Sequence, residues 1–182
     1  SSDVCSSDLN TLQSKRLLKK MKIQENISLK NYNTFGVEAK AHYFAEVHDL
    51  HELKYATEFA KINHIKILFL GGGSNLLFTQ DFDGLVIKLN LKGISEENLD
   101  ENHVLVSAKA GVNWHEFVLY TLSKNYGGLE NLSLIPGNVG TCPIQNIGAY
   151  GTEIKDHFVS CKALNLETSE IEELSLEDCK FG

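Results

Sequence analysis

The alternation of hydrophobic and polar residues predicts strands and helices in turn from residue 41 onward. Ala41–Val47 has the composition of a strand, and Asp49 then caps a helix, with Glu52 completing a capping box. Apolar residues at helical spacing predict one buried face on that helix: Leu50, Leu53, Ala56, Phe59 and Ala60. The nearly continuous apolar run Ile65–Leu70 predicts a strand covered on both sides. Strand, helix and strand in this order indicate a βαβ unit with a right-handed crossover.

Further strands and a second helix are predicted in the rest of the chain. The strands are expected at Gly84–Leu89, His103–Lys109 and His157–Leu166, and another element begins at Ser175–Asp178. The second helix follows the cap residue Asn113. We expect this helix to bury Trp114, Phe117, Val118 and Leu122. The predicted fold class is α+β with mixed sheets.

The first 20 residues stand apart from this pattern. The only methionine is Met21, and upstream of it Ser1–Asp3 is echoed by Ser6–Asp8 before a basic stretch. We expect residues 1–20 to be a non-native or disordered extension, and we leave them out of the fold argument.

Composition and charge restrict the class of partner. The 182 residues are 42% hydrophobic and carry a net charge of −7, which argues against nucleic acid or an anionic membrane surface as partner. No apolar run reaches the roughly 18 residues of a transmembrane helix, so we expect a cytoplasmic protein. The histidines lack metal-binding spacing, and no metal is expected. The cysteines lack a Cys-x-x-Cys pair, which fits reduced thiols better than a disulfide framework: Cys5, Cys142, Cys161 and Cys179.

A glycine-rich segment follows the apolar run that ends at Leu70. Its residues are Gly71, Gly72, Gly73, Ser74, Asn75 and Leu76. Glycines lack a Cβ, so successive backbone N–H groups can converge on an anion, and the two small polar residues add side-chain donors. Leu76 stands where a dinucleotide fingerprint needs its third glycine, and the Gly-Lys-Ser/Thr of a P-loop is absent. A purely structural turn is the alternative.

A second unusual segment, residues 136–151, contains both prolines of the chain and four of its fourteen glycines. Gln145, Asn146 and Tyr150 supply amide and phenol groups within an otherwise apolar stretch, which suits a flat heteroaromatic ring with polar edges. Neither segment contains Lys or Arg, so a bound pyrophosphate would be held by backbone N–H groups and polar side chains. A long structural loop is the alternative.

Together with Asn33-Thr34-Phe35-Gly36, these two segments resemble the bacterial UDP-N-acetylenolpyruvoylglucosamine reductase family (UDP-N-acetylmuramate dehydrogenases) in order and rough spacing. The resemblance covers residues 21–182. It implies the two-lobed FAD-binding fold of the vanillyl-alcohol oxidase/PCMH type, C-terminally incomplete. Residues 21–66 would form the small lobe and residues 67–182 the larger lobe, with the substrate domain absent.

The resemblance also implies a cofactor and a reaction. FAD would be the cofactor, with its pyrophosphate on residues 71–76. The pyrophosphate and isoalloxazine would also be lined by the second segment, through Pro136, Gly137, Val139, Gly140, Gln145, Asn146, Gly148, Ala149 and Tyr150. Cys142 beside a flavin would be sensitive to oxidation. NADPH would be the co-substrate in reducing UDP-N-acetylglucosamine enolpyruvate to UDP-N-acetylmuramate for peptidoglycan.

The catalytic residues of the family are expected beyond Gly182, so this chain alone is expected to be inactive. Two other functions stay open at this point. One is a different FAD oxidoreductase of the same fold, and the other is a stand-alone flavin-binding module without catalysis.

Overall fold

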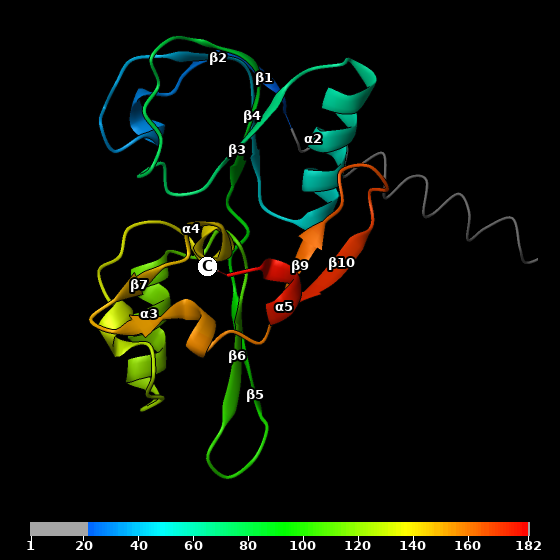
Figure 1. Ribbon diagram of the computed structural model, residues 1–182. Coiled ribbons are helices and arrows are strands. Elements are labelled where there is room, and N and C mark those ends of the chain that lie inside the picture. The colour runs from blue at the N-terminus through cyan, green and yellow to red at the C-terminus, as the bar shows by residue number, and fades with distance from the viewer. Residues whose placement is uncertain (1–21, 182) are drawn as a thin grey trace, which may run out of the picture.

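The first half of the chain is built on one four-stranded mixed sheet (Figure 1). The computed structural model describes residues 22–181, so the expectation for residues 1–20 lies outside the described residues. The strands occur in the order β1-β2-β4-β3, with bounds β1 (Gln24–Ser28), β2 (Lys40–Val47), β3 (Ile67–Leu70) and β4 (Phe82–Leu89). Strand β1 is antiparallel to β2, whereas β2 and β3 are both parallel to β4.

Helix α2 (Leu50–Ile62) connects β2 to β3, which confirms the predicted strand, helix and strand. The Asp49 side chain accepts a hydrogen bond from the Glu52 N–H at 2.8 Å. The second bond of the predicted capping box differs by one residue. The Glu52 carboxylate accepts from the N–H of His48 and not from that of the cap residue Asp49. Leu50 is 40% exposed, and the buried face of the helix is therefore narrower than expected.

The sheet is covered on its two faces by different clusters, because side chains of successive strand residues point to opposite sides. Leu85 and Ile87 of β4 pack with α2, whereas Val86 packs with Phe44 and Leu29 on the other face. Strand β3 lies at the edge of this sheet, and Phe69 is 38% exposed. The prediction that this strand is covered on both sides was therefore wrong.

The second half of the chain begins with an antiparallel hairpin of β5 (Ile94–Asn98) and β6 (Val104–Ala108). Helix α3 (Trp114–Ser123) follows, and its cap Asn113 accepts from the Glu116 N–H at 3.1 Å, as the sequence predicted. The helix buries the expected residues except Leu122, which is 41% exposed. Thr121 takes the buried place one residue earlier, on the same face as the other buried positions.

The remaining elements are five residues long or shorter. They are β7 (Gly148–Ala149), β8 (Thr152–Glu153), β9 (Ser160–Leu164), β10 (Ile171–Ser175), α4 (Cys142–Gln145) and α5 (Leu176–Cys179), with 3-10 turns η1 (Lys30–Tyr32), η2 (Glu130–Leu132), η3 (Val139–Thr141) and η4 (Ile154–Asp156). Strand β9 confirms the predicted late strand. Among residues 22–181, no helix has the length and apolar character needed to cross a membrane.

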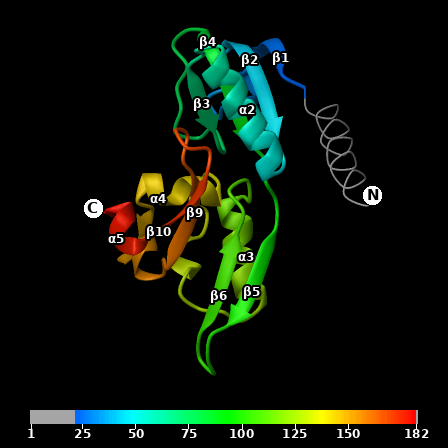
Figure 2. The ribbon, with the colours of Figure 1, turned by 90° about the vertical axis from the view of Figure 1, so that its right-hand side faces the viewer.

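Figures 1 and 2 show two lobes, one above the other. The hydrophobic clusters of residues 22–91 are separate from the cluster formed by later residues. We call these parts the first lobe (residues 22–91) and the second lobe (residues 92–181). The expected lobe boundary after residue 66 stays a prediction, although β3 and β4 beyond that residue pair within the first sheet.

Candidate functional site

The candidate site lies where the carboxyl ends of the parallel strands β2, β3 and β4 meet the second lobe. Residues 71–76, here called the glycine loop, follow directly on β3. Residues 136–151, here called the proline–glycine loop, contain α4, which lies just below the first lobe in Figures 1 and 2. In sheets of parallel strands, ligands bind outside the carboxyl ends of the strands.

The two loops are in direct contact, although about sixty residues separate them in the sequence. A Cβ built on Gly72 would lie 3.0 Å from the Cα of Gly137, and one on Gly71 would lie 2.8 Å from Cγ2 of Thr141. No larger residue would allow the two backbones to approach this closely without a shift.

One cavity of about 280 Å³ is lined by both loops. Its lining residues are Asn75, Ile135, Pro136, Gln145, Asn146, Ile147 and Gly148. Three amide side chains therefore lie among apolar residues, which is the arrangement that a flat ring with polar edges requires. Five of these seven residues were predicted from the sequence. Ile135, just before the proline–glycine loop, and Ile147, within it, were missed because an isolated apolar residue carries no distinguishing signal.

The other predicted residues of the proline–glycine loop have different surroundings. The N–H of Val139 donates to the Val112 carbonyl at 2.9 Å, and that of Gly140 donates to the Ala110 carbonyl at 3.1 Å. A Cβ on Gly140 would lie 2.5 Å from that of Ala110, so close packing explains this glycine. Tyr150 is 89% exposed. None of these three residues lines the cavity.

Gly137 and Ala149 do not line the cavity, although their sequence neighbours Pro136 and Gly148 do. Gly137 contacts the glycine loop as described above, and its carbonyl accepts from the Trp114 N–H at 3.0 Å. Ala149 pairs with Thr152 in the short β7–β8 hairpin. Their predicted contact with a cofactor stays a prediction.

Within the glycine loop, packing against the first lobe dominates. Gly71 and Gly73 are buried and Leu76 packs on the cluster around Phe44, whereas Gly72 and Asn75 are exposed and Ser74 is half-buried. Gly73 has a φ of 75°, and a Cβ there would lie 2.0 Å from the Tyr32 carbonyl oxygen. Asn75 is the residue of this loop that lines the cavity.

The Asn33-Thr34-Phe35-Gly36 motif contacts the glycine loop. The buried Asn33 amide donates to the carbonyls of Leu29 at 2.8 Å and Val37 at 3.0 Å, and its oxygen accepts from the Val37 N–H at 3.0 Å. The adjacent Thr34 N–H donates to the Gly73 carbonyl at 3.2 Å. The motif therefore has a structural role that the sequence did not reveal.

Lys88 brings a positive charge that the sequence analysis missed. Its ammonium donates to the Gly71 carbonyl from the end of β4, where the residue is half-buried. Burial lowers the pKa of Lys88, the Glu46 carboxylate opposes this effect, and Lys92 adds to it. The loops themselves contain no Lys or Arg, as noted, but strand pairing places Lys88 beside Leu70, directly before the glycine loop.

Cys142 is the first residue of α4, within the proline–glycine loop, and is 6% exposed. Burial raises the pKa of its thiol to about 12, and Cys161 and Cys179 act in the same direction. The thiolate is the reactive form of cysteine. The expectation that Cys142 is sensitive to oxidation is therefore not supported.

Comparison with known protein families identifies the family of this chain. The family described as "FAD binding domain" matches residues 41–175 of this chain. The chain belongs to the FAD-binding domain family. The cofactor predicted from the sequence, FAD, is the one that the description of this family names.

Curated relatives of this FAD-binding domain are longer proteins. It is 57% identical over 162 residues to the UDP-N-acetylenolpyruvoylglucosamine reductase of Flavobacterium johnsoniae. The aligned region covers 89% of this chain and 48% of that protein. It is 47% identical over 162 residues to the protein of the same name from Pseudomonas fluorescens, with the same coverage of 89% and 48%. The chain thus spans about half the length of these relatives.

Solved structures confirm the predicted fold type. The UDP-N-acetylenolpyruvylglucosamine reductase of Thermus caldophilus has a TM-score of 0.68 and 26% identity, covering 87% of this chain and 54% of that one. A vanillyl-alcohol-oxidase-type flavoprotein of Myceliophthora thermophila has a TM-score of 0.58 and 15% identity, covering 73% and 26%. The second likeness concerns the fold alone.

Proposed function

We propose that this FAD-binding domain is the flavin-binding part of a UDP-N-acetylenolpyruvoylglucosamine reductase. The reaction would use NADPH to reduce UDP-N-acetylglucosamine enolpyruvate to UDP-N-acetylmuramate for bacterial peptidoglycan. The observation that carries the proposal is the cavity walled by both loops, because it brings together the two segments on which the resemblance rests. The 57% identity to a reductase of this name supports the same function. A cytoplasmic location is part of the proposal.

The residues present fit FAD. Ile135, Pro136 and Ile147 offer apolar contact for the faces of the isoalloxazine ring, and the amides of Gln145 and Asn146 offer donors and acceptors for its edges. A cavity of about 280 Å³ suits the ring better than the whole dinucleotide, since ligand pockets measure about 300–1,000 Å³. The pyrophosphate would lie along the glycine loop, near the charge of Lys88.

FAD supplies the hydride transfer when it is bound. The work of this chain in the proposal is to bind and orient the cofactor and to exclude water from one face of it. The resemblance places the proton-donating and substrate-binding residues of the family beyond Gly182. The proposal therefore assigns no catalytic residue to the chain.

Titration of the purified chain with FAD tests the binding role. We expect flavin fluorescence to change and saturate at one FAD per chain. Gln145→Ala should weaken binding roughly fivefold, since one hydrogen bond contributes about 1 kcal/mol. Asn102→Ala, in the exposed β5–β6 turn, is the matched control and should leave the affinity unchanged. Equal affinities for the two variants would contradict the proposed site.

A second assay separates the reductase from its alternatives. The full chain with FAD, joined to whatever further residues its gene encodes, is mixed with NADPH. We expect NADPH oxidation only after the enolpyruvyl sugar nucleotide is added. FAD binding without this dependence would instead favour a flavin-binding module or another oxidoreductase of the same fold.

A further inference from the structure

Two cysteines that are distant in the sequence lie next to each other in the second lobe. The sulfurs of Cys161 on β9 and Cys179 at the end of α5 are 3.9 Å apart. Both thiols are free and half-buried. The cysteines are scattered along the sequence, and only the fold brings these two together.

Packing on both sides holds the two thiols together. Strand β10 pairs with β9 so that Leu174 lies opposite Cys161, and α5 starts directly after β10. The turn is fixed by Ser175, whose N–H and hydroxyl donate to the Asp178 carboxylate at 2.9 and 2.7 Å. The close approach of the sulfurs therefore follows from the pairing of β9 with β10 and from the Ser175–Asp178 turn that starts α5.

A contact between two aromatic rings also holds the start of β9 next to the end of α5. Phe158, just before β9, and Phe181, just after α5, have ring centroids 5.1 Å apart in an edge-to-face arrangement. Such pairs contribute about 0.5–1.5 kcal/mol beyond their buried area. The cysteines lie between these anchors, so α5 cannot move away from β9 without breaking the ring contact.

We propose that Cys161 and Cys179 form a modification site that a two-electron oxidant such as hydrogen peroxide converts into a disulfide. An S–S bond measures about 2.05 Å, so the sulfurs need to approach by about 1.9 Å. Rotation of two half-buried side chains provides a movement of this size. The inference concerns the second lobe itself and does not depend on the proposed function.

The chemistry requires no other reactant. The thiolate of one cysteine attacks an oxygen of the peroxide, the O–O bond breaks, and hydroxide leaves, which gives a sulfenic acid. The sulfur of the second cysteine attacks the sulfenic sulfur, the S–S bond forms and the S–O bond breaks. The proton of the second thiol leaves with the oxygen as water. Two thiols lose two electrons and two protons, and one peroxide becomes two waters.

Either cysteine of the pair can make the first attack, since their sulfurs are 3.9 Å apart. Burial raises the pKa of Cys161, and its hydrogen bond with Cys179 acts in the same direction. The thiolate is the reactive form of cysteine, so the raised pKa makes Cys161 less reactive at neutral pH. Cys142 is buried, with its pKa raised to about 12, so it stays outside the reaction.

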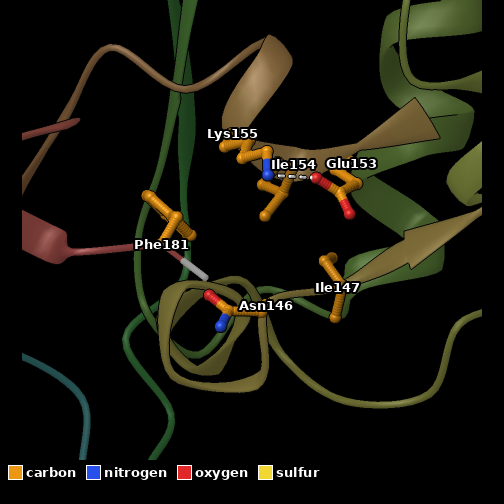
Figure 3. Close-up of a pocket in the computed structure, with 6 residues that line it drawn as sticks. All are labelled: Asn146, Ile147, Glu153, Ile154, Lys155 and Phe181. Carbon is orange, nitrogen blue, oxygen red and sulfur yellow. Dashed lines mark ion pairs between the residues drawn. The ribbon is translucent and has the colours of Figure 1, made fainter.

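The cross-link would join α5 to β9 close to the candidate site. Phe181, two residues after Cys179, lines a small cavity of about 10 Å³ together with Asn146 (Figure 3). Asn146 also lines the larger cavity between the two loops. A disulfide between residues 161 and 179 restricts the unfolded chain, so it should raise the thermal midpoint of unfolding. It should also hold Phe181 in place at the small cavity.

Mass spectrometry of unreduced peptides tests the site directly. The full chain is incubated with hydrogen peroxide or with dithiothreitol, and its remaining thiols are then alkylated. We expect the oxidised sample to contain one peptide pair joined through Cys161 and Cys179, lighter than the two separate peptides by two hydrogen atoms. Dithiothreitol should reverse the cross-link, and the oxidised protein should unfold at a higher temperature than the reduced one.

Variants separate the pair from the other thiols. Cys142→Ser should keep the cross-link and the thermal shift, whereas Cys179→Ser should lose both. Cross-links through Cys142 or Cys5, or stepwise oxygen addition at Cys161 without an S–S bond, would overturn the proposal. If Cys179→Ser does not fold, the peptides of the oxidised and reduced wild-type protein decide the question alone.

Discussion

Asn33 fixes the turn beside the glycine loop through three side-chain hydrogen bonds, and the adjacent Thr34 N–H contacts that loop. Removing the Asn33 side chain is therefore expected to affect both stability and cofactor binding. In Asn33→Ala the carbonyl and the N–H of Val37 lose their side-chain partner, and the Leu29 carbonyl keeps only the Tyr32 N–H. Asn33 is only 7% exposed, so water cannot easily replace the lost amide. Asn33→Asp keeps the acceptor for the Val37 N–H, but a carboxylate cannot donate to either carbonyl.

The expected loss follows from these bonds. Each buried hydrogen bond contributes about 1 kcal/mol, and an unsatisfied partner costs about 1–3 kcal/mol. We therefore expect Asn33→Ala to lower the free energy of unfolding by about 3 kcal/mol or more, against a total of about 5–15 kcal/mol for a folded domain. For a chain of this size that corresponds to a thermal midpoint lower by about 6–12 °C.

Thermal denaturation and FAD titration of the same variant measure the two consequences. The Thr34 N–H donates to the Gly73 carbonyl, so loss of the Asn33 bonds should weaken FAD binding as well as stability. Asn31→Ala, two residues away and exposed, is the control and should change the unfolding free energy by no more than about 0.5 kcal/mol. If Asn33→Ala lowers the midpoint no more than this control does, the support that we assign to Asn33 is refuted.

Four further substitutions test other parts of the first and second lobes. Gly73→Ala and Gly36→Ala both place a Cβ at positive φ, but only the first meets backbone atoms, so only Gly73→Ala should abolish FAD binding in a fluorescence titration. Lys88→Met removes the ammonium from the start of the glycine loop and should weaken FAD binding about tenfold, as expected for a charged hydrogen bond; unchanged affinity would contradict this. The hydrogen bond from Lys124 lowers the pKa of Glu96 below its ordinary 4.5, so its stabilisation is present above that pH and is lost as the pH falls. In Glu96→Gln, acid should therefore lower the thermal midpoint less than in the wild type.

The helices were predictable because their signals are local. Both caps involve residues three positions apart, Asp49 with Glu52 and Asn113 with Glu116, and the structure contains both N-cap bonds. The apolar spacing also identified the buried residues of α3 except at its last turn. There the sequence offered Leu122, but the helix turns Thr121 inward, where its hydroxyl donates to the Val118 carbonyl at 2.8 Å.

The missed features depend on partners far away in the sequence. Strand β5 (Ile94–Asn98) has a single apolar residue, and it is a strand because β6 pairs with it. Lys88 lies beside the glycine loop only because β4 pairs with β3. Tyr150 was expected in the site because of its chemistry. Its φ of 53° belongs to the left-handed region, and the side chain is 89% exposed.

The glycines that suggested a ligand site are largely explained by contacts of the protein with itself. Gly71 and Gly72 contact the proline–glycine loop, Gly73 contacts Tyr32, and Gly140 contacts Ala110. A structural turn would have the same composition, so the glycines alone do not separate the two interpretations. The cavity favours the ligand site over a purely structural turn, because the packing of the glycines brings Asn75 to the same cavity as Gln145. Because contacts within the protein hold the two loops against each other, these contacts lower the entropy cost of ordering the loops around a cofactor.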